Sequence, residues 1–109
     1  MSLNYYAIRP ASNNNYAIRM ASANGHLNVV KYLMNLPRGD NIQANIDDNF
    51  AFKYAASGGH TNVVRYLLKL PREYGINPRA GKDFALKEAQ RKGYKDIEKL
   101  IKNDSRYYF

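Results

Sequence analysis

The two histidines, His26 and His60, are the first candidates for chemistry, because an imidazole can bind a metal ion or transfer a proton. They lie far apart in the sequence, and each directly follows a glycine. One histidine per turn at that separation offers no shared set of metal ligands. Tyr94 stands at the same place in a third, similar segment. We therefore interpret both histidines as structural residues of a repeated turn.

A second candidate is a phosphate-binding loop that would run from Gly75 to Lys82. Such a loop has four residues between its two glycines, followed by lysine and then serine or threonine. Here five residues separate Gly75 from Gly81, and Asp83 stands where the hydroxyl residue should be. The sequence therefore argues against a phosphate-binding loop.

The acidic residues do not form a recognisable metal site. Asp47 and Asp48 are adjacent, but no further carboxylate follows at the spacing of a calcium loop, and neighbouring acids are common in turns. The chain also has no cysteine and no grouping of serine, histidine and carboxylate. We therefore expect a protein that is not an enzyme and that takes no metal, cofactor or small-molecule substrate.

The absence of cysteine and the hydropathy of the chain indicate where in the cell the protein is expected. Without cysteine, neither a disulfide framework nor a thiolate metal site can form, which fits the inside of a cell. The opening residues MSLNYYAIRP lack the apolar core of a signal peptide, and no apolar run reaches the roughly 18 residues of a membrane span. We expect a soluble, intracellular protein, cytoplasmic in the simplest case, with no membrane partner.

The net charge is +8, from 17 lysines and arginines against 9 acidic residues. That charge attracts nucleic acid, anionic membranes and acidic proteins. It is evenly spread, because residues 1–70 carry 7 basic and 3 acidic residues and residues 71–109 carry 10 and 6. A basic tail is therefore excluded.

A 34-residue repeat determines the expected fold. Residues 16–37, YAIRMASANGHLNVVKYLMNLP, return as residues 50–71, FAFKYAASGGHTNVVRYLLKLP, with 11 of 22 positions identical. A third, less regular copy begins at Phe84. Such periods are typical of stacked units, none of which can bury its apolar face alone. The sequence predicts one all-α domain over residues 1–109, a repeat solenoid of three helix-turn-helix units at about 6–37, 38–71 and 72–105, with extended connecting loops.

Each unit is expected to begin with a short helix, about residues 50–57 in the second copy. The small residues Ala51 and Ala55 permit close approach by a neighbouring helix. Asn49 precedes this helix, and its side-chain oxygen is expected to cap the first free amides, with Asn15 and Asp83 in the same column. The turn after the helix contains glycine in every copy, at Gly25, Gly59 and Gly93, where a left-handed C-cap is predicted.

The second helix of each unit is apolar on almost every side. In the second copy only Asn62, Arg65 and Lys69 are polar, and their spacing forms one narrow stripe that faces water. Asn28, Lys31 and Asn35 repeat this stripe in the first copy, and Asp96, Lys99 and Asn103 in the third. Pro37 and Pro71 are expected to end the first two of these helices.

Two antiparallel helices, a Gly-His turn and a V-V-x-x-L-L second helix, recurring with this 34-residue period, resemble the ankyrin repeat. The resemblance covers roughly residues 6–105 and is carried by Gly25, His26, Val29, Val30, Leu33, Gly59, His60, Val63, Val64, Leu67 and Leu68. The family's Thr-Pro-Leu-His opening is replaced by YAIR, FAFK and FALK, a variant similar to ankyrin arrays of amoebae and their giant viruses. Leu-Pro follows the second helix, so the family's projecting β-hairpins are expected to be reduced to loops. The resemblance implies a non-catalytic protein-binding scaffold.

The two ends of the array are expected to differ. The third copy ends as KDIEKLIKNDSRYYF, with charged residues at columns that are apolar in the second copy, which suits a terminal cap. The first copy has no such replacement, so Tyr5, Tyr6 or Ile8 is expected to shield it. The truncated copy Tyr6-Ala7-Ile8-Arg9 is what a fragment of a longer array would show.

Repetition places nine of the 17 basic residues in three rows. Neighbours about 10 Å apart repel by only roughly 0.4 kcal/mol in water, so the rows alone do not indicate binding and are equally compatible with a solvated surface. They face different ways, whereas nucleic acid favours one continuous basic stripe with stacking aromatics. Nucleic-acid or other polyanion binding is therefore the second hypothesis. The rows are Arg19, Lys53 and Lys87; Lys31, Arg65 and Lys99; and Arg38, Arg72 and Arg106.

The leading hypothesis is a protein-interaction module whose concave face binds an acidic partner. In the resembled family, variable positions beside the first helix make the contacts. Tyr54 is the best single anchor, because an aromatic side chain flanked by Arg19, Lys53 and Lys87 suits an acidic partner with one apolar side chain. An exposed tyrosine that only covers neighbouring apolar atoms is the alternative. The candidate partner-binding residues are Arg19, Met20, Asn24, Lys53, Tyr54, Ser57, Lys87, Glu88 and Arg91.

Overall fold

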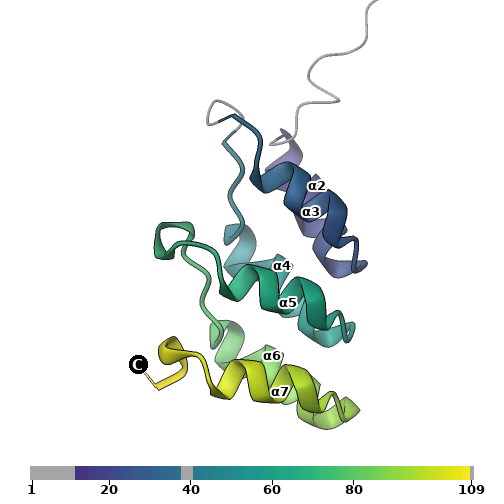
Figure 1. Cartoon of the computed structure of the whole chain (residues 1–109), viewed down its shortest axis with the longest axis vertical. Helices are drawn as coiled ribbons and strands as arrows, with labels where there is room; N and C mark the ends of the chain where they lie inside the picture. Colours follow the sequence, from purple (N-terminus) through teal and green to yellow (C-terminus); the bar gives the residue numbers. More distant parts are fainter. Residues whose placement is uncertain (1–11, 38–40, 109) are drawn as a thin grey trace, which may run out of the picture.

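Three helix pairs stack one below the other, with the connections projecting to one side (Figure 1). The computed structural model describes residues 12–37 and 41–108, with side chains from residue 15 onward. Every regular element in those ranges is helical, which confirms the predicted all-α solenoid of three units. The α-helices are α2 (Ser12–Ala23), α3 (Leu27–Met34), α4 (Ile46–Ser57), α5 (Thr61–Leu68), α6 (Ala80–Lys92) and α7 (Lys95–Lys102); the 3-10 helices are η2 (Arg72–Tyr74) and η3 (Ser105–Tyr108).

The connections contain no strand in their described residues, which agrees with loops in place of hairpins. The boundaries of the three units remain a prediction, and Tyr5, Tyr6 and Ile8, which were expected to shield the first unit, lie outside the described residues.

A left-handed turn precedes the first helix of the second and third units. Asp47, Asp48 and Asn49 have φ of 58°, 53° and 61°, and residues 81–83 have φ of 67°, 57° and 65°. The right-handed helix therefore starts at Phe50, where the sequence predicted it. Left-handed backbone costs about 1–2 kcal/mol for most residues and less for glycine, asparagine and aspartate, which explains why such residues fill most of this turn.

This turn corrects the expected caps. The side-chain oxygen of Asn49 accepts a hydrogen bond from the backbone N–H of Asn77 at 2.9 Å, and that of Asn15 accepts one from Gln43 at 2.9 Å. The predicted bonds within each helix were wrong, because an N-cap has extended backbone and these residues have left-handed φ. Instead, both asparagines hold the connection that leads into the following unit.

The prediction that Asp83, in the same column, caps its helix was also wrong. Its two carboxylate oxygens accept hydrogen bonds from Arg79, each at 2.9 Å. The partner of Asn15 and the partner of Asn49 each stand 28 residues further on in the chain.

The first helices of adjacent units pack closely along their length, whereas the second helices approach one another at few points. Small residues permit the close approach, since Ala51, Ala55, Ala85 and Ala89 are completely buried. The stack therefore curves, with the first helices on its inner side and the second helices on its outer side. The molecule is elongated, with extents of 49, 25 and 21 Å.

The glycine turns confirm the sequence prediction. Gly25, Gly59 and Gly93 have φ of 77°, 76° and 79°, which favours glycine. At Gly59 an added Cβ would lie 2.8 Å from Cζ of the Tyr94 ring, and at Gly25 it would meet the ring of His60. Each ring therefore packs against the glycine of the preceding turn, which supports a structural role for His60.

Val29, Val63 and Ile97 occupy one column of the repeat, but their exposure to solvent differs between the three units. Val63 and Ile97 are 1% and 0% exposed because the preceding unit covers them, whereas Val29 is 46% exposed. At the other end, Gln90, Glu98 and Lys102 replace the apolar residues of the second unit. Glu98 accepts hydrogen bonds from Gln90 at 3.2 Å and from Lys102 at 2.9 Å. This polar row is consistent with the expected cap, which stays a prediction.

Candidate functional site

An aromatic cluster lies on the inner face, formed by Phe50 and Tyr54 of α4 and Phe84 of α6. The ring centroids of Phe50 and Tyr54 are 4.5 Å apart, and those of Tyr54 and Phe84 are 5.3 Å apart. Phe50 and Tyr54 share one helix face because they are four residues apart, and Phe84 occupies the column of Phe50 in the next unit. Tyr54 remains 38% exposed, while the two phenylalanines are half-buried. We call Phe50, Tyr54 and Phe84 the inner aromatic cluster.

Two of the predicted cations lie over rings and do not extend freely into solvent. The guanidinium carbon of Arg19 lies 5.3 Å from the centroid of Phe50 and 5.8 Å from that of Tyr16. Lys53 Nζ lies 5.8 Å from the centroid of Phe84 and 3.3 Å from a carboxylate oxygen of Asp48. Exposed cation–π contacts contribute about 0.5–1 kcal/mol each. Both cations therefore help to hold the rings in place.

Lys87 differs from these two cations because its side chain is exposed. It lies on α6, three residues after Phe84, and therefore on the same helix face as that ring. Of the three cations predicted to flank Tyr54, Lys87 is the most accessible to a partner.

A polar network borders the aromatic cluster, centred on Glu88. Its carboxylate forms a two-point ion pair with Arg91, at 3.0 and 3.1 Å, and accepts a hydrogen bond from the Ser57 hydroxyl at 3.0 Å. Lys92 donates to the carbonyl of Ser57 at 2.6 Å and lies 3.5 Å from Glu88. Arg91 first, and then Ser57, lower the pKa of Glu88 from 4.5 to about 2. The network keeps Glu88 ionised and leaves one net positive charge.

The remaining predicted residues, Met20 and Asn24, lie on or directly after α2. Met20 is half-buried, and Asn24 is exposed with its amide donating to the Met20 carbonyl at 2.9 Å. Thus Tyr54, Ser57, Lys53, Lys87, Glu88 and Arg91 gather around α4 and α6, while Met20 and Asn24 lie one unit away.

The sequence prediction did not include Phe50 and Phe84 in the site. It treated them as the aromatic residues that open each unit. The signal that could have found them was present, since Phe50 lies four residues before Tyr54 and Phe84 stands in the column of Phe50 in the third copy.

The three basic rows do not join into one stripe. Lys31, Arg65 and Lys99 are exposed on the second helices, as predicted, and the first-helix row lies on the opposite, inner face. In the third row, Arg38 lies outside the described residues.

Arg106 does not belong to a surface row, because it is half-buried at the C-terminal end. It donates to the Leu68 carbonyl at 2.6 Å and the Ile76 carbonyl at 3.2 Å, and Asp104 binds its guanidinium at 2.8 Å. That part of the prediction was wrong, because the chain turns after α7 and brings this side chain back onto the second unit.

Within residues 12–37 and 41–108, no three histidine or acidic side chains gather as a metal site would require. No helix in the described part has the length and apolar character needed to cross a membrane.

Stacked helix pairs with a packed interior and a broad, exposed inner face define a repeat scaffold that binds through its surface. A family model for ankyrin repeats, in three copies, matches residues 17–107, and the chain therefore belongs to the ankyrin-repeat family. Ankyrin repeats are generally non-catalytic modules that bind other proteins. No curated protein and no solved structure matches the chain.

Proposed function

We propose that this chain binds an acidic segment of another protein on its inner face, with Tyr54 as the apolar anchor. The observation that carries the proposal is the position of Tyr54, which is exposed between Phe50 and Phe84 and bordered by unneutralised positive charge. The absence of cysteine favours an intracellular, cytoplasmic setting for this interaction.

The anchor is held in place before a partner arrives. Aromatic pairs at this spacing contribute about 0.5–1.5 kcal/mol beyond the area they bury, so Phe50 and Phe84 restrict the Tyr54 ring. A restricted side chain loses less entropy on binding. Tyrosine is also one of the residue types most often found among the few interface positions that supply most of the binding energy.

The charges around the anchor supply selectivity. Lys87 is exposed, and Arg91 and Lys92 together exceed the single charge of Glu88. Surface charges of this kind mainly raise the association rate and exclude partners of like charge, and salt screens them. An acidic segment with one apolar side chain fits both the ring and its border.

Nucleic acid remains the alternative partner. It would need a continuous basic track, but the first-helix row includes Arg19 and Lys53, which already lie over rings, and the second-helix row lies on the other face. We therefore rank binding of nucleic acid or another polyanion second.

The test is an unbiased protein pull-down at 150 mM salt that compares the proteins bound by the wild-type chain with those bound by two variants. Tyr54→Ala is expected to lose the specific partner or to weaken its binding at least about tenfold, whereas Tyr32→Ala, which removes a more exposed tyrosine from α3, should retain it. If Tyr54→Ala bound the same proteins as tightly as the wild type does, Tyr54 would not be the anchor. Nanomolar binding of generic DNA or RNA with a steep salt dependence would favour the alternative.

A further inference from the structure

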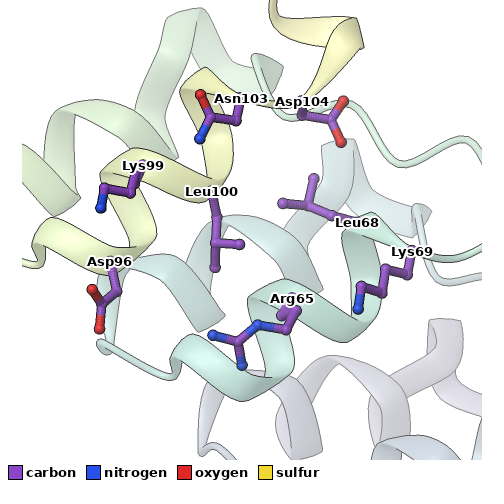
Figure 2. A pocket seen from close by; sticks show the side chains of 8 residues that line it. All are labelled: Arg65, Leu68, Lys69, Asp96, Lys99, Leu100, Asn103 and Asp104. Atoms are coloured by element: carbon purple, nitrogen blue, oxygen red, sulfur yellow. The ribbon is translucent and has the colours of Figure 1, made fainter.

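A groove with a volume of about 350 Å³ lies on the outer side, between α5 and α7. Figure 2 shows Leu68 and Leu100 pointing toward its middle, with Arg65 and Lys69 on the side of α5 and Lys99 on the side of α7. Volumes of about 300–1,000 Å³ are usual for pockets that hold small ligands. The groove is remote from the inner aromatic cluster, because the first and second helices lie on opposite sides of the stack.

The groove lies where one column of the repeat holds a leucine and the preceding unit holds a tyrosine. One unit earlier, Tyr66 occupies the column of Leu100 and Asn35 that of Lys69. Tyr66 lies beside Asn35, the residue that directly follows α3, and burial raises the pKa of Tyr66. The phenol of Tyr66 therefore lies between α5 and the C-terminal end of α3. Between α5 and α7 the shorter Leu100 stands in the column of Tyr66, and Lys69 stands in the column of Asn35.

The rim of the groove is positively charged. Lys69 and Lys99 are exposed and form no ion pair with a described residue, and Arg65 donates only to the uncharged Asn62 side chain, at 2.9 Å. Of the two acids in the lining, Asp104 has both oxygens bound by Arg106 at 2.8 Å.

The other acid, Asp96, is exposed and has no ion pair in the described part of the chain. Three cations thus face one uncompensated acid around an apolar floor. The phosphates of a nucleic acid would be repelled by Asp96 and would leave Leu68 and Leu100 uncovered. Nucleic acid therefore suits this groove less well than a peptide.

We propose that this groove is a second interaction site, which binds an acidic protein segment by inserting one aromatic side chain between Leu68 and Leu100. The ring takes the place that Tyr66 fills one unit earlier, and an apolar cavity of about 150 Å³ is enough for a benzene ring. Carboxylates on either side of the aromatic residue meet Lys69, Lys99 and Arg65. The site is independent of the inner face and does not rest on the function proposed for it.

The probes are two acetylated and amidated peptides, EEFEE and EEAEE, which differ only in the aromatic side chain. Each is titrated into the full chain while the leucine methyl signals are followed by NMR. EEFEE is expected to shift the signals of Leu68 and Leu100 and to bind at least about fivefold more tightly than EEAEE. Equal affinities would overturn the proposal, because they would leave charge as the only source of binding.

Leu100→Tyr is the matched variant, because it restores the ring that the array itself uses in this column. It is expected to weaken EEFEE binding at least about tenfold, and Leu100→Phe should do the same if the tyrosine variant folds poorly. Tyr32→Ala, which removes an exposed tyrosine of α3 outside both sites, should leave the affinity read from the Leu68 signals unchanged. Undiminished binding to both Leu100 variants, read from the same signals, would overturn the proposal, whereas shifts at Tyr54 would report the separate inner-face site.

A charge variant tests the rim separately. Replacing Lys69 and Lys99 together by glutamine is expected to weaken EEFEE about three- to tenfold and to flatten its salt dependence. A ten-residue oligothymidylate that shifts the Leu68 signals equally in wild type and in Leu100→Tyr would assign the groove to polyanions and overturn the peptide proposal.

Discussion

The side-chain oxygen of Asn49 accepts a hydrogen bond from the backbone N–H of Asn77, 2.9 Å away and 28 residues later in the chain. Asn49 is 7% exposed, so its amide is removed from water at the point where one unit passes into the next. The same bond joins Asn15 to Gln43 one unit earlier, at the same distance. This column therefore couples neighbouring units as well as shaping its own turn.

Asn49→Ala is expected to destabilise the protein by about 2–5 kcal/mol. The substitution leaves the Asn77 amide without its partner, which costs about 1–3 kcal/mol, and forces alanine into left-handed backbone, which costs about 1–2 kcal/mol. Asn49→Gly should lose only the first part, and Asn49→Asp should remain close to wild type because it keeps an acceptor oxygen. Urea denaturation monitored by circular dichroism measures the differences. An alanine variant as stable as the aspartate variant would contradict the coupling role.

Gly59→Ala and Gly93→Ala form a second comparison, because both glycines have nearly the same backbone, with φ of 76° and 79°. At Gly59 the new Cβ would lie 2.8 Å from the Tyr94 ring, whereas nothing lies within 4 Å at Gly93. Gly93→Ala is expected to cost about 1–2 kcal/mol for the backbone alone. Gly59→Ala should cost clearly more, and equal losses in thermal denaturation would show that Tyr94 does not pack on the glycine.

These residues show how far the sequence determines the fold. Gly59 and Val63 were predictable because a left-handed turn and a buried column recur with the 34-residue period, so local rules apply three times over. The partner of Asn49 was not predictable, because the bond depends on how the next connection lies against the first helix. Because of this contact between units, which no local sequence pattern encodes, the Asn49 oxygen accepts from the backbone of the next connection and not from the amides of its own helix.

The candidate site was predicted less completely for the same reason. Its position around Tyr54 followed from repeat columns, and the exposed Lys87 agrees with that prediction. The contacts of Lys53 with Asp48 and Phe84 could not be predicted from the sequence, because they depend on side-chain conformations across two units. The groove between α5 and α7 was not predicted either, because no sequence motif marks it. It coincides with the difference between Tyr66 and Leu100 in one column of the repeat.

The pKa of Glu88 offers a test by titration. Hydrogen bonds from Arg91 and then Ser57 lower it from 4.5 to about 2. Because the folded value is below the unfolded one, the stabilisation is present above about pH 4.5 and is lost as pH falls toward 2. The NMR signal of the side-chain carboxyl carbon should titrate near pH 2 in the wild type. Arg91→Gln should raise the midpoint more than Ser57→Ala.

Glu88→Gln provides the matching stability measurement. The variant cannot titrate at this position, so the difference in unfolding free energy between wild type and variant should shrink as pH falls from 4.5 toward 2. Other acids in the chain titrate in both proteins and cancel in this difference. A difference that stays constant over that range would refute the lowered pKa.

The stacking order can be tested with two valines of one column, Val63 and Val29. Val63 is 1% exposed because the first unit covers it, and its replacement by alanine should cost about 2 kcal/mol through lost burial and the cavity left behind. Val29 is 46% exposed, so the same change should cost less than about 1 kcal/mol. Urea denaturation of the two variants under identical conditions gives both values. Equal destabilisation would mean that the first unit is covered in solution, and that its outer column is packed like those of the second and third units.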